Sequence, residues 1–313
     1  MKGIYNDEEL ALLEHCTLCP WECGVNRFEG GYGICGTDAG LNVASVCIHR
    51  GEEPAISGNK GICNVFFSGC SLSCIYCQNH EISHPESDIC SAENDFGSVI
   101  GRIEGILSEG INTIGFVTPT HVVPQMKAIV RELHSRGHHP VIVYNTSSYD
   151  KVETLRSLAG IIDVYLPDLK YVTPSLASEY SGAPDYPEVA IRALKEMYFQ
   201  KGSSFRIDEK GNAEHGMLIR HLVLPGHADE SIRVLETIAE ELSPGVRLSL
   251  MSQYHPAAGA WNHPVLNRPL MREEYLKVVV AMEKLGFRNG WVQEMESSKT
   301  YRPDFRKDHP FEY

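Results

Sequence analysis

The chain has 313 residues, of which 42% are hydrophobic and 22% charged, and this composition excludes a disordered protein. Its formal net charge of −13 disfavours nucleic acid and anionic membranes as partners. The apolar runs are too short to span a bilayer, and the acidic start lacks the apolar region of a secretory signal. We therefore expect a cytoplasmic protein.

The first part of the chain is rich in cysteine. All ten cysteines lie within the first 90 residues. A disulfide framework needs an oxidising compartment, whereas in a reducing one such clustering favours metal binding. Residues 1–62 show no sustained periodicity and predict a loop-built, metal-binding extension, with one short helix over 6–15.

From residue 63, short apolar runs alternate with amphipathic stretches. Strands are predicted over 64–68, 111–117, 140–145, 161–168, 217–225, 246–252 and 290–293. Helices are predicted over 93–110, 124–134, 150–158, 185–202, 229–242 and 272–286. This alternation indicates βαβ units and a parallel sheet, as a complete or partial (β/α) barrel or an open doubly wound sheet. We expect this α/β domain over 63–293 and a surface-wrapping tail over 294–313.

A compact cysteine motif follows the first of these strands, with Cys70, Cys74 and Cys77 within eight residues. Three thiolates suit three irons of a [4Fe–4S] cluster and leave the fourth iron open. Two other interpretations stay open, namely a zinc site that borrows a distant ligand and three buried structural thiols. The motif lies at the end of a strand, where (β/α) proteins place their active sites.

The CxxxCxxC motif in this position resembles the radical S-adenosylmethionine (SAM) superfamily. Further motifs extend the resemblance over about 16–256: Cys77-Gln78-Asn79, YNTSSY (144–149), YLPDLKY (165–171), RHLVLPG (220–226) and LMSQYHP (250–256). Together they resemble the pyruvate formate-lyase activating enzyme-like subgroup of PflX type. The resemblance implies a partial (β/α)6 radical SAM barrel. It also implies reductive cleavage of SAM at the [4Fe–4S] cluster to a 5′-deoxyadenosyl radical, which abstracts hydrogen from a substrate.

The same resemblance suggests a SAM pocket at the strand ends. Asp168 and Lys170 form an Asp-x-Lys motif similar to one that holds SAM in the activases, although an exposed ion pair is the alternative. Many relatives carry Gly-Gly-Glu after the second strand, where this chain has Thr118, Pro119 and Thr120. The two threonines or backbone carbonyls would replace that contact. His121 either reaches into the pocket or is structural.

Other strand-end residues complete the predicted pocket. Asn145 would bind ribose hydroxyls or cap a helix. Further cofactor-binding candidates are Tyr76, Asn79 and Arg220, and adenine or the substrate would face Gln253, Tyr254 and His255. Phe66, Phe67 and Tyr76 either shield the radical from water or pack in the core. No catalytic residue is assigned beyond these cofactor contacts.

A second cysteine set, Cys16, Cys19, Cys23 and Cys35, precedes the barrel. Four thiolates fit either zinc or an auxiliary iron–sulfur cluster, and the CxxC spacing favours zinc. An empty set of thiols is the remaining alternative. We expect the metal here to be structural and separate from the radical chemistry. The remaining cysteines, Cys47, Cys63 and Cys90, have no spaced partner and are interpreted as structural.

Three functions follow from these observations. The first is a radical SAM oxidoreductase that acts on a protein such as a glycyl-radical enzyme, with electrons from a flavodoxin- or ferredoxin-type donor. The second is radical modification of a small molecule or nucleoside by the same core. The third is a non-catalytic zinc-binding scaffold. A fold-level likeness does not decide the substrate.

Overall fold

The computed structural model describes residues 2–84, 95–295, 303–307 and 309–311. Nine strands form a sheet in the order β1-β2-β3-β4-β5-β7-β8-β9, with β6 paired to β7. Their bounds are β1 Val43–His49, β2 Ile62–Phe67, β3 Thr113–Val117, β4 Val141–Thr146, β5 Val164–Pro167, β6 Arg206–Ile207, β7 Ala213–Leu222, β8 Arg247–Met251 and β9 Gly290–Val292. From β2 to β9 the neighbours on this path are parallel, and β1 is antiparallel to β2.

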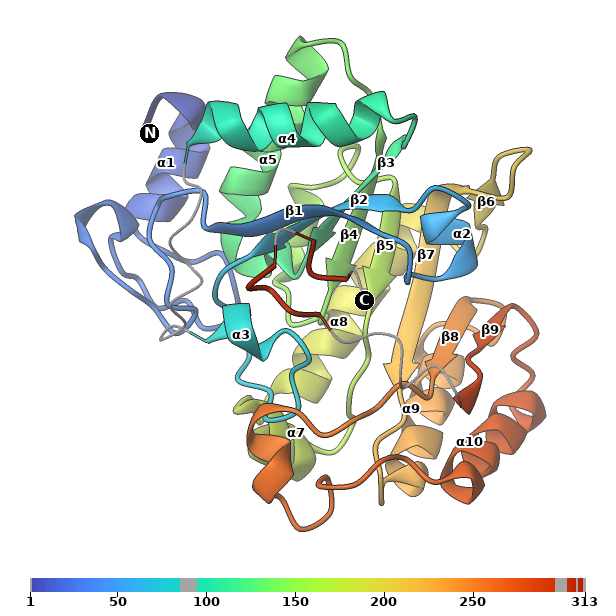
Figure 1. Cartoon of the computed structure of the whole chain (residues 1–313). Helices are drawn as coiled ribbons and strands as arrows, with labels where there is room; N and C mark the ends of the chain where they lie inside the picture. The colour runs from blue at the N-terminus through green and yellow to red at the C-terminus, as the bar shows by residue number, and fades with distance from the viewer. Residues whose placement is uncertain (1, 85–94, 296–302, 308, 312–313) are drawn as a thin grey trace.

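Helices connect the parallel strands and lie outside them (Figure 1). The connecting helices are α4 Phe96–Ser108, α5 Val123–Ser135, α6 Val152–Arg156, α7 Pro174–Ser181, α8 Tyr186–Lys201, α9 Ala228–Glu241 and α10 Arg272–Lys284. The shorter helices are η1 Lys2–Ile4, α1 Asp7–Glu14, η2 Arg27–Glu29, α2 Pro54–Ser57, α3 His80–Ser83, η4 Pro119–Val122 and η5 Ala258–Asn262. The predicted α/β fold with a largely parallel, unclosed sheet is confirmed.

The sequence at the two ends of α4 explains where this helix starts and stops. At the start of α4, the Asp95 carboxylate accepts a hydrogen bond from the backbone N–H of Ser98 at 2.8 Å. Shortly after the helix, Gly110 adopts a φ of 82°, which ends helical geometry at little cost for glycine. Residues 93 and 94 of the predicted helix lie outside the described residues, as does Cys90.

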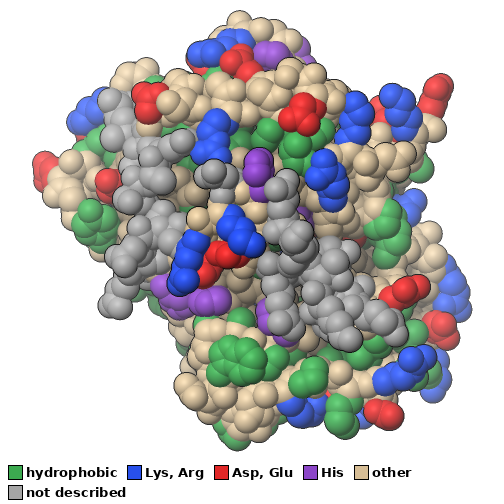
Figure 2. Space-filling view, viewed as in Figure 1, with side chains coloured by type: hydrophobic (Ala, Val, Ile, Leu, Met, Phe, Trp, Pro, Cys, Tyr) green, Lys and Arg blue, Asp and Glu red, His purple; other side chains and the backbone are tan. Residues whose placement is uncertain are grey.

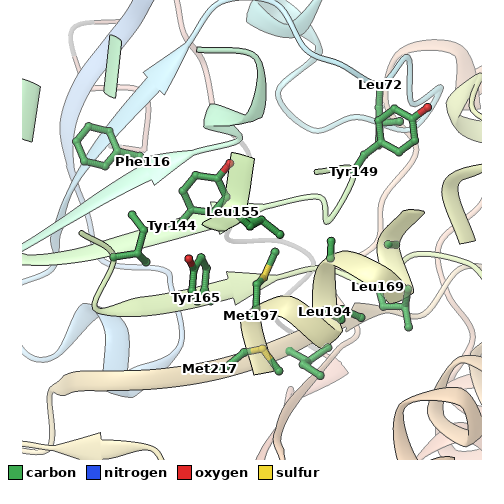
Figure 3. Packing of buried hydrophobic residues seen from close by; sticks show 14 of the residues in the cluster. Leu72, Phe116, Tyr144, Tyr149, Leu155, Tyr165, Leu169, Leu194, Met197 and Met217 are labelled. Atoms are coloured by element: carbon green, nitrogen blue, oxygen red, sulfur yellow. The ribbon is translucent and has the colours of Figure 1, made fainter. Parts of the chain in front are cut away.

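The core lies between the sheet and its helices. In the parallel register, Phe116 pairs with Tyr144, Tyr144 with Tyr165, and Tyr165 with Met217. These four residues are buried, and Figure 3 shows the rings of Tyr144 and Tyr165 beside Leu155 and Met197 of the covering helices, with Phe116 on the far side of Tyr144. One row of large side chains across neighbouring strands thus fixes the helices on this face.

The prediction of a loop-built segment over 1–62 was wrong for β1. Val46 of β1 pairs with Val65 of β2, so this segment adds an antiparallel strand to the sheet. Most residues of β1 are buried, and the strand therefore lacks the alternation by which a half-exposed strand is recognised. The short helix near the start is confirmed as α1, which has a capping box between Asn6 and Glu9.

The described parts of the C-terminal tail lie across β1 and β2 (Figure 1). The ring of Phe305 packs edge-on against Phe66 at 5.2 Å between centroids. The ring of Phe311 lies 4.0 Å from the ring of His49. Two aromatic contacts thus attach the tail to the sheet beside the strand ends.

Among the described residues, no helix combines the length and apolar character needed to cross a bilayer. On the face shown in Figure 2, acidic and basic side chains are interspersed over the described elements.

Candidate functional site

A cavity of about 210 Å³ lies at the carboxyl ends of the parallel strands. Every strand from β2 to β8 on the sheet path contributes a lining residue near its end. Among the predicted site residues, the cavity is lined by Cys70, Cys74, Tyr76, Cys77, Asn79, Thr118, Asn145, Asp168, Lys170 and Arg220. The tertiary structure therefore gathers most of the predicted site in one place.

The three thiols of the CxxxCxxC motif each have a hydrogen-bond partner. The backbone N–H of Leu72 donates to Cys70 Sγ at 3.4 Å, and the Ser181 hydroxyl lies 3.0 Å from Cys74 Sγ. The Ser83 hydroxyl donates to Cys77 Sγ at 3.5 Å. Burial raises the pKa of Cys74 to about 11, although Lys170 opposes the rise. Donors to the sulfur atoms stabilise thiolate ligands and tune the potential of a cluster bound to them.

A buried ion-pair network forms another part of the cavity lining, close to Cys74. Asp168 accepts from Lys170 Nζ at 2.9 Å and from Arg220 Nε at 2.8 Å. Burial alone would raise the pKa of Asp168, but the two cations outweigh it and hold the pKa below its usual value. The carboxylate and both cations therefore carry charge inside the cavity.

Sequence reasoning missed Glu52, which also lines the cavity. Its carboxylate accepts from Arg220 Nη1 at 3.1 Å and from Asn64 Nδ2 at 3.1 Å. Arg220 Nη2 further donates to Asn145 Oδ1 at 2.7 Å, so one guanidinium joins residues from four segments. Glu52 lies in the segment expected to be a connector, and no local motif marks it. The one signal that could have found Glu52 is indirect. A buried cation such as Arg220 needs carboxylate partners, and Asp168 supplies only one of them.

The residues that stand in place of Gly-Gly-Glu differ in whether they line the cavity. Thr118 lines the cavity with a φ of 50°, an unusual conformation for a β-branched residue. Thr120 is fully buried and donates to Asp150 Oδ1 at 2.8 Å. His121 is also buried, and its Nε2 lies 2.8 Å from the carbonyl oxygen of Ser68. Thr120 and His121 therefore lie outside the cavity lining, because their side chains bond within the protein; for His121 this is the structural alternative.

Among the aromatic candidates and those after the sixth predicted strand, some line the cavity and others do not. Phe66 and Tyr76 line the cavity, whereas Phe67 packs in the core. The Tyr76 hydroxyl is hydrogen-bonded to that of Tyr171, and burial raises its pKa well above the usual value. Gln253 lines the cavity, but the Tyr254 hydroxyl donates to the carbonyl of Leu266 at 2.6 Å. The lining does not include His255.

One member of the second cysteine set contacts a buried arginine. Cys16, Cys19 and Cys35 are buried and Cys23 is half-buried. Arg27 is 2% exposed, and its Nη2 donates to Cys35 Sγ at 2.9 Å. In the described part of the chain, Arg27 forms no ion pair with a carboxylate. Burial raises the pKa of Cys19 to about 12.

Neither cysteine set has the geometry of a single-ion site. Among the residues that the structure describes, no group of three or more His, Cys, Asp or Glu side chains is arranged so that it could hold a metal ion. A [4Fe–4S] cluster binds each thiolate to a different iron, so its ligands do not converge on one point. A zinc ion does need four converging ligands, at about 2.3 Å for thiolates.

Comparison with known proteins agrees with a cluster-binding site. Residues 56–179 match the family model described as 4Fe-4S single cluster domain, and this range holds the CxxxCxxC motif and the Asp-x-Lys motif. The fold and site thus define an α/β protein with a largely parallel sheet, in which residues 56–179 are similar to 4Fe–4S single cluster domains.

Two individual proteins are similar to the chain. The uncharacterized protein MJ0674 of Methanocaldococcus jannaschii is 27% identical over 281 residues, which cover 87% of this chain and 75% of that protein. The crystal structure of Streptococcus suis SuiB bound to S-adenosylmethionine has a TM-score of 0.45 and 14% identity, over 72% of this chain. The chain spans about half the length of SuiB, at 48%.

Proposed function

We propose that this protein is a radical SAM enzyme. One observation carries the proposal: three hydrogen-bonded thiols and a buried carboxylate–lysine pair line the same cavity. The thiols are those expected for a [4Fe–4S] cluster with one open iron, and the 4Fe–4S family match covers them. When bound, the cluster supplies the electron that cleaves SAM to methionine and a 5′-deoxyadenosyl radical.

The charged wall suits the amino-acid end of SAM. That end carries an ammonium and a carboxylate, and the cavity offers Asp168 and Lys170 as complementary charges beside Cys74. Asn145, at the end of β4, offers an amide for the ribose hydroxyls. Charges held in a buried network need little reorganisation on binding, which favours a defined orientation of the bound molecule.

Apolar groups on the cavity wall would protect a reactive radical. Phe66, Tyr76 and Leu72 are buried, and Phe311 of the tail joins them in the lining. Their role is to exclude water and to hold the substrate C–H bond against the radical source. The tail thereby supplies part of the wall.

The test is anaerobic reconstitution with iron and sulfide, followed by addition of SAM and a strong reductant. We expect about four irons per chain in the cavity site and formation of 5′-deoxyadenosine. The matched control is Cys47→Ala, which removes a buried cysteine of β1 outside the cavity lining and should leave both readouts unchanged. A protein that binds zinc only and forms no 5′-deoxyadenosine would be a scaffold and would refute the proposal.

We further propose hydrogen abstraction from a glycine of a partner protein, as in the PflX-type activases. The motifs 144–149, 165–171 and 220–226 support this finer assignment by resemblance. A flavodoxin- or ferredoxin-type protein in the cytoplasm would deliver the electron. A stable glycyl-radical signal on a glycyl-radical enzyme incubated with the loaded protein tests the assignment. Turnover of a small molecule or nucleoside without such a signal would contradict it.

We also propose that Cys16, Cys19, Cys23 and Cys35 bind a second metal, either zinc or an iron–sulfur cluster. Arg27 supports this site, because a fully buried guanidinium without a carboxylate partner among the described residues needs another anion. A metal with four thiolates carries net negative charge and would satisfy that need beside Cys35.

A further inference from the structure

The cysteine-rich segment rests directly on the residues that flank Cys70. The indole Nε1–H of Trp21, which lies between Cys19 and Cys23, donates to the carbonyl oxygen of Ser71 at 2.6 Å. On the other side of Cys70, a Cβ at Gly69 would lie 2.1 Å from the carbonyl oxygen of Cys35. Gly69 has a φ of 74°, so both its conformation and this close approach require glycine.

A third connection runs through two buried side chains. Arg27 Nη2 donates to Cys35 Sγ at 2.9 Å, and its Nη1 donates to the carbonyl oxygen of His121 at 2.7 Å. The ring of His121 in turn contacts the carbonyl oxygen of Ser68 at 2.8 Å. Three separate contacts therefore reach positions 68, 69 and 71, on both sides of the first cluster ligand.

The aromatic packing shows that Trp21 itself is held in place. Its ring meets Tyr149 edge-on at 5.9 Å, and Tyr149 stacks on Tyr186 at 6.2 Å. The Tyr186 hydroxyl accepts from the backbone N–H of Lys170 at 2.9 Å. Trp21 thus contacts the loop that carries Cys70 directly and the backbone of Lys170 through two tyrosine rings.

We propose that the second cysteine set positions the cluster loop, with Trp21 as the positioning residue. Binding a metal must draw the four thiols together, and the contacts at Ser68, Gly69 and Ser71 pass that movement to Cys70. Occupancy of the second site then sets the environment of the first cluster. This proposal rests on the proposed function for its cluster readouts, and it differs from the expectation that the second site is separate from the radical chemistry.

The first experiment compares Trp21→Phe with the parent. The substitution keeps an aromatic ring but removes the N–H donor to Ser71, together with part of the indole volume. The control Trp291→Phe removes an indole on β9, outside the cavity lining. Trp21→Phe should retain the iron content but change the spectrum and midpoint potential of the reduced cluster. We also expect about three- to tenfold weaker SAM binding, the effect of one lost hydrogen bond. The control should match the parent.

The second experiment is a double-mutant cycle between Trp21→Phe and the pair Cys16→Ser with Cys19→Ser. If metal occupancy of the second site acts through Trp21, the shifts in midpoint potential caused by the two changes are less than additive. Additive shifts, or a Trp21→Phe protein with the parent spectrum, potential and SAM affinity, would overturn the proposal. Trp21→His, which retains a ring N–H, should recover part of the parent spectrum and replaces Trp21→Phe if that variant does not fold.

A third readout separates this proposal from the proposed function. Amide hydrogen exchange of residues 68–75 can be followed without any cluster, and we expect about tenfold faster exchange in Trp21→Phe than in Trp291→Phe. Equal exchange in the two variants would refute the coupling even if the enzyme cleaves SAM. If Trp21→Phe exchanges faster but the parent protein cleaves no SAM, only the proposed function is refuted.

Discussion

Asp168 and Arg220 lie 52 residues apart in sequence and are joined through both side chain and backbone. Arg220 Nε donates to Asp168 Oδ1 at 2.8 Å, and the two residues form a parallel β-bridge beyond the end of β5. The backbone N–H of Leu169 donates to the Arg220 carbonyl at 3.0 Å. The charge pair is therefore positioned by the sheet itself, where β5 and β7 become neighbours.

Asp168→Asn should weaken both SAM binding and folding. The substitution leaves Lys170 and Arg220 without their shared carboxylate in a site where the side chains are 13–18% exposed. Removal of one partner of a buried pair costs about 3 kcal/mol, so the melting temperature should fall. Calorimetry and SAM titration measure the two effects. Asp229→Asn, which breaks an exposed pair with Lys277, is the control and should leave the melting temperature nearly unchanged. Unaltered SAM affinity in Asp168→Asn would contradict the assignment.

Single Ala variants of Cys70, Cys74 and Cys77 should each lose most of the cluster iron and all SAM cleavage. The physical reason is that each thiolate would bind a different iron, and among the described residues no fourth cysteine lines the cavity to replace it. Iron analysis and 5′-deoxyadenosine assays measure the loss. Cys47→Ala should retain both properties. Parent-like iron content in all three variants would show that the cluster is bound elsewhere.

Acid should destabilise the start of α10 through Glu274. Arg268 donates two hydrogen bonds to its carboxylate, at 2.7 and 2.9 Å, and lowers the pKa of Glu274 from 4.5 to about 2. A lowered pKa contributes stability above pH 4.5 that is lost as the pH falls towards 2, because the unfolded chain binds the proton first. The contribution is about 1–2 kcal/mol after discounting for solvent screening.

Urea unfolding of the parent and Glu274→Gln at pH 6 and at pH 3 tests this contribution. The difference between the two proteins should be larger at pH 6. Glu273→Gln, on the exposed face of the same turn, is the control and should show no such pH dependence. A Glu274→Gln effect that is equal at both pH values would disprove the role of its ionisation.

The double variant Cys16→Ala with Cys19→Ala should lose the second metal and keep the four irons of the cavity site. A loop-rich segment depends on its bound metal for order, so the loss should also make residues 1–42 more sensitive to proteolysis. Elemental analysis decides which metal is bound. Loss of one zinc supports a zinc site, and loss of about four irons supports a second cluster. An unchanged metal content would exclude a metal at these cysteines.

Much of the fold could be predicted because its signals are local. Helix α5 and strand β3 follow from the spacing of apolar residues, over a few turns for the helix and a few residues for the strand. Their observed bounds lie within two residues of the predicted ones. Strand β1 and helix α7 were not predicted. Strand β1 is buried on both faces, and α7 is a short helix whose first residue is a proline.

The sequence by itself determined the chemistry that is encoded in short motifs. Cys70, Cys74 and Cys77 are recognisable because cluster ligands must lie close together on one loop. Asp168 and Lys170 are recognisable for the same reason, since two residues on one strand end share a direction. The parallel sheet also predicts that strand-end residues such as Asn145 converge on one site.

Only the tertiary structure decided which partners these residues meet. Glu52 joins the network because the segment that follows edge strand β1 brings it to Arg220, a long-range placement that no local pattern reports. His121 lies outside the cavity lining because its ring is hydrogen-bonded to the carbonyl oxygen of Ser68 in the interior. Trp21 reaches Ser71 across 50 residues of sequence. Contacts of this kind depend on how separate elements pack, and the amino-acid pattern of each element alone does not contain that information.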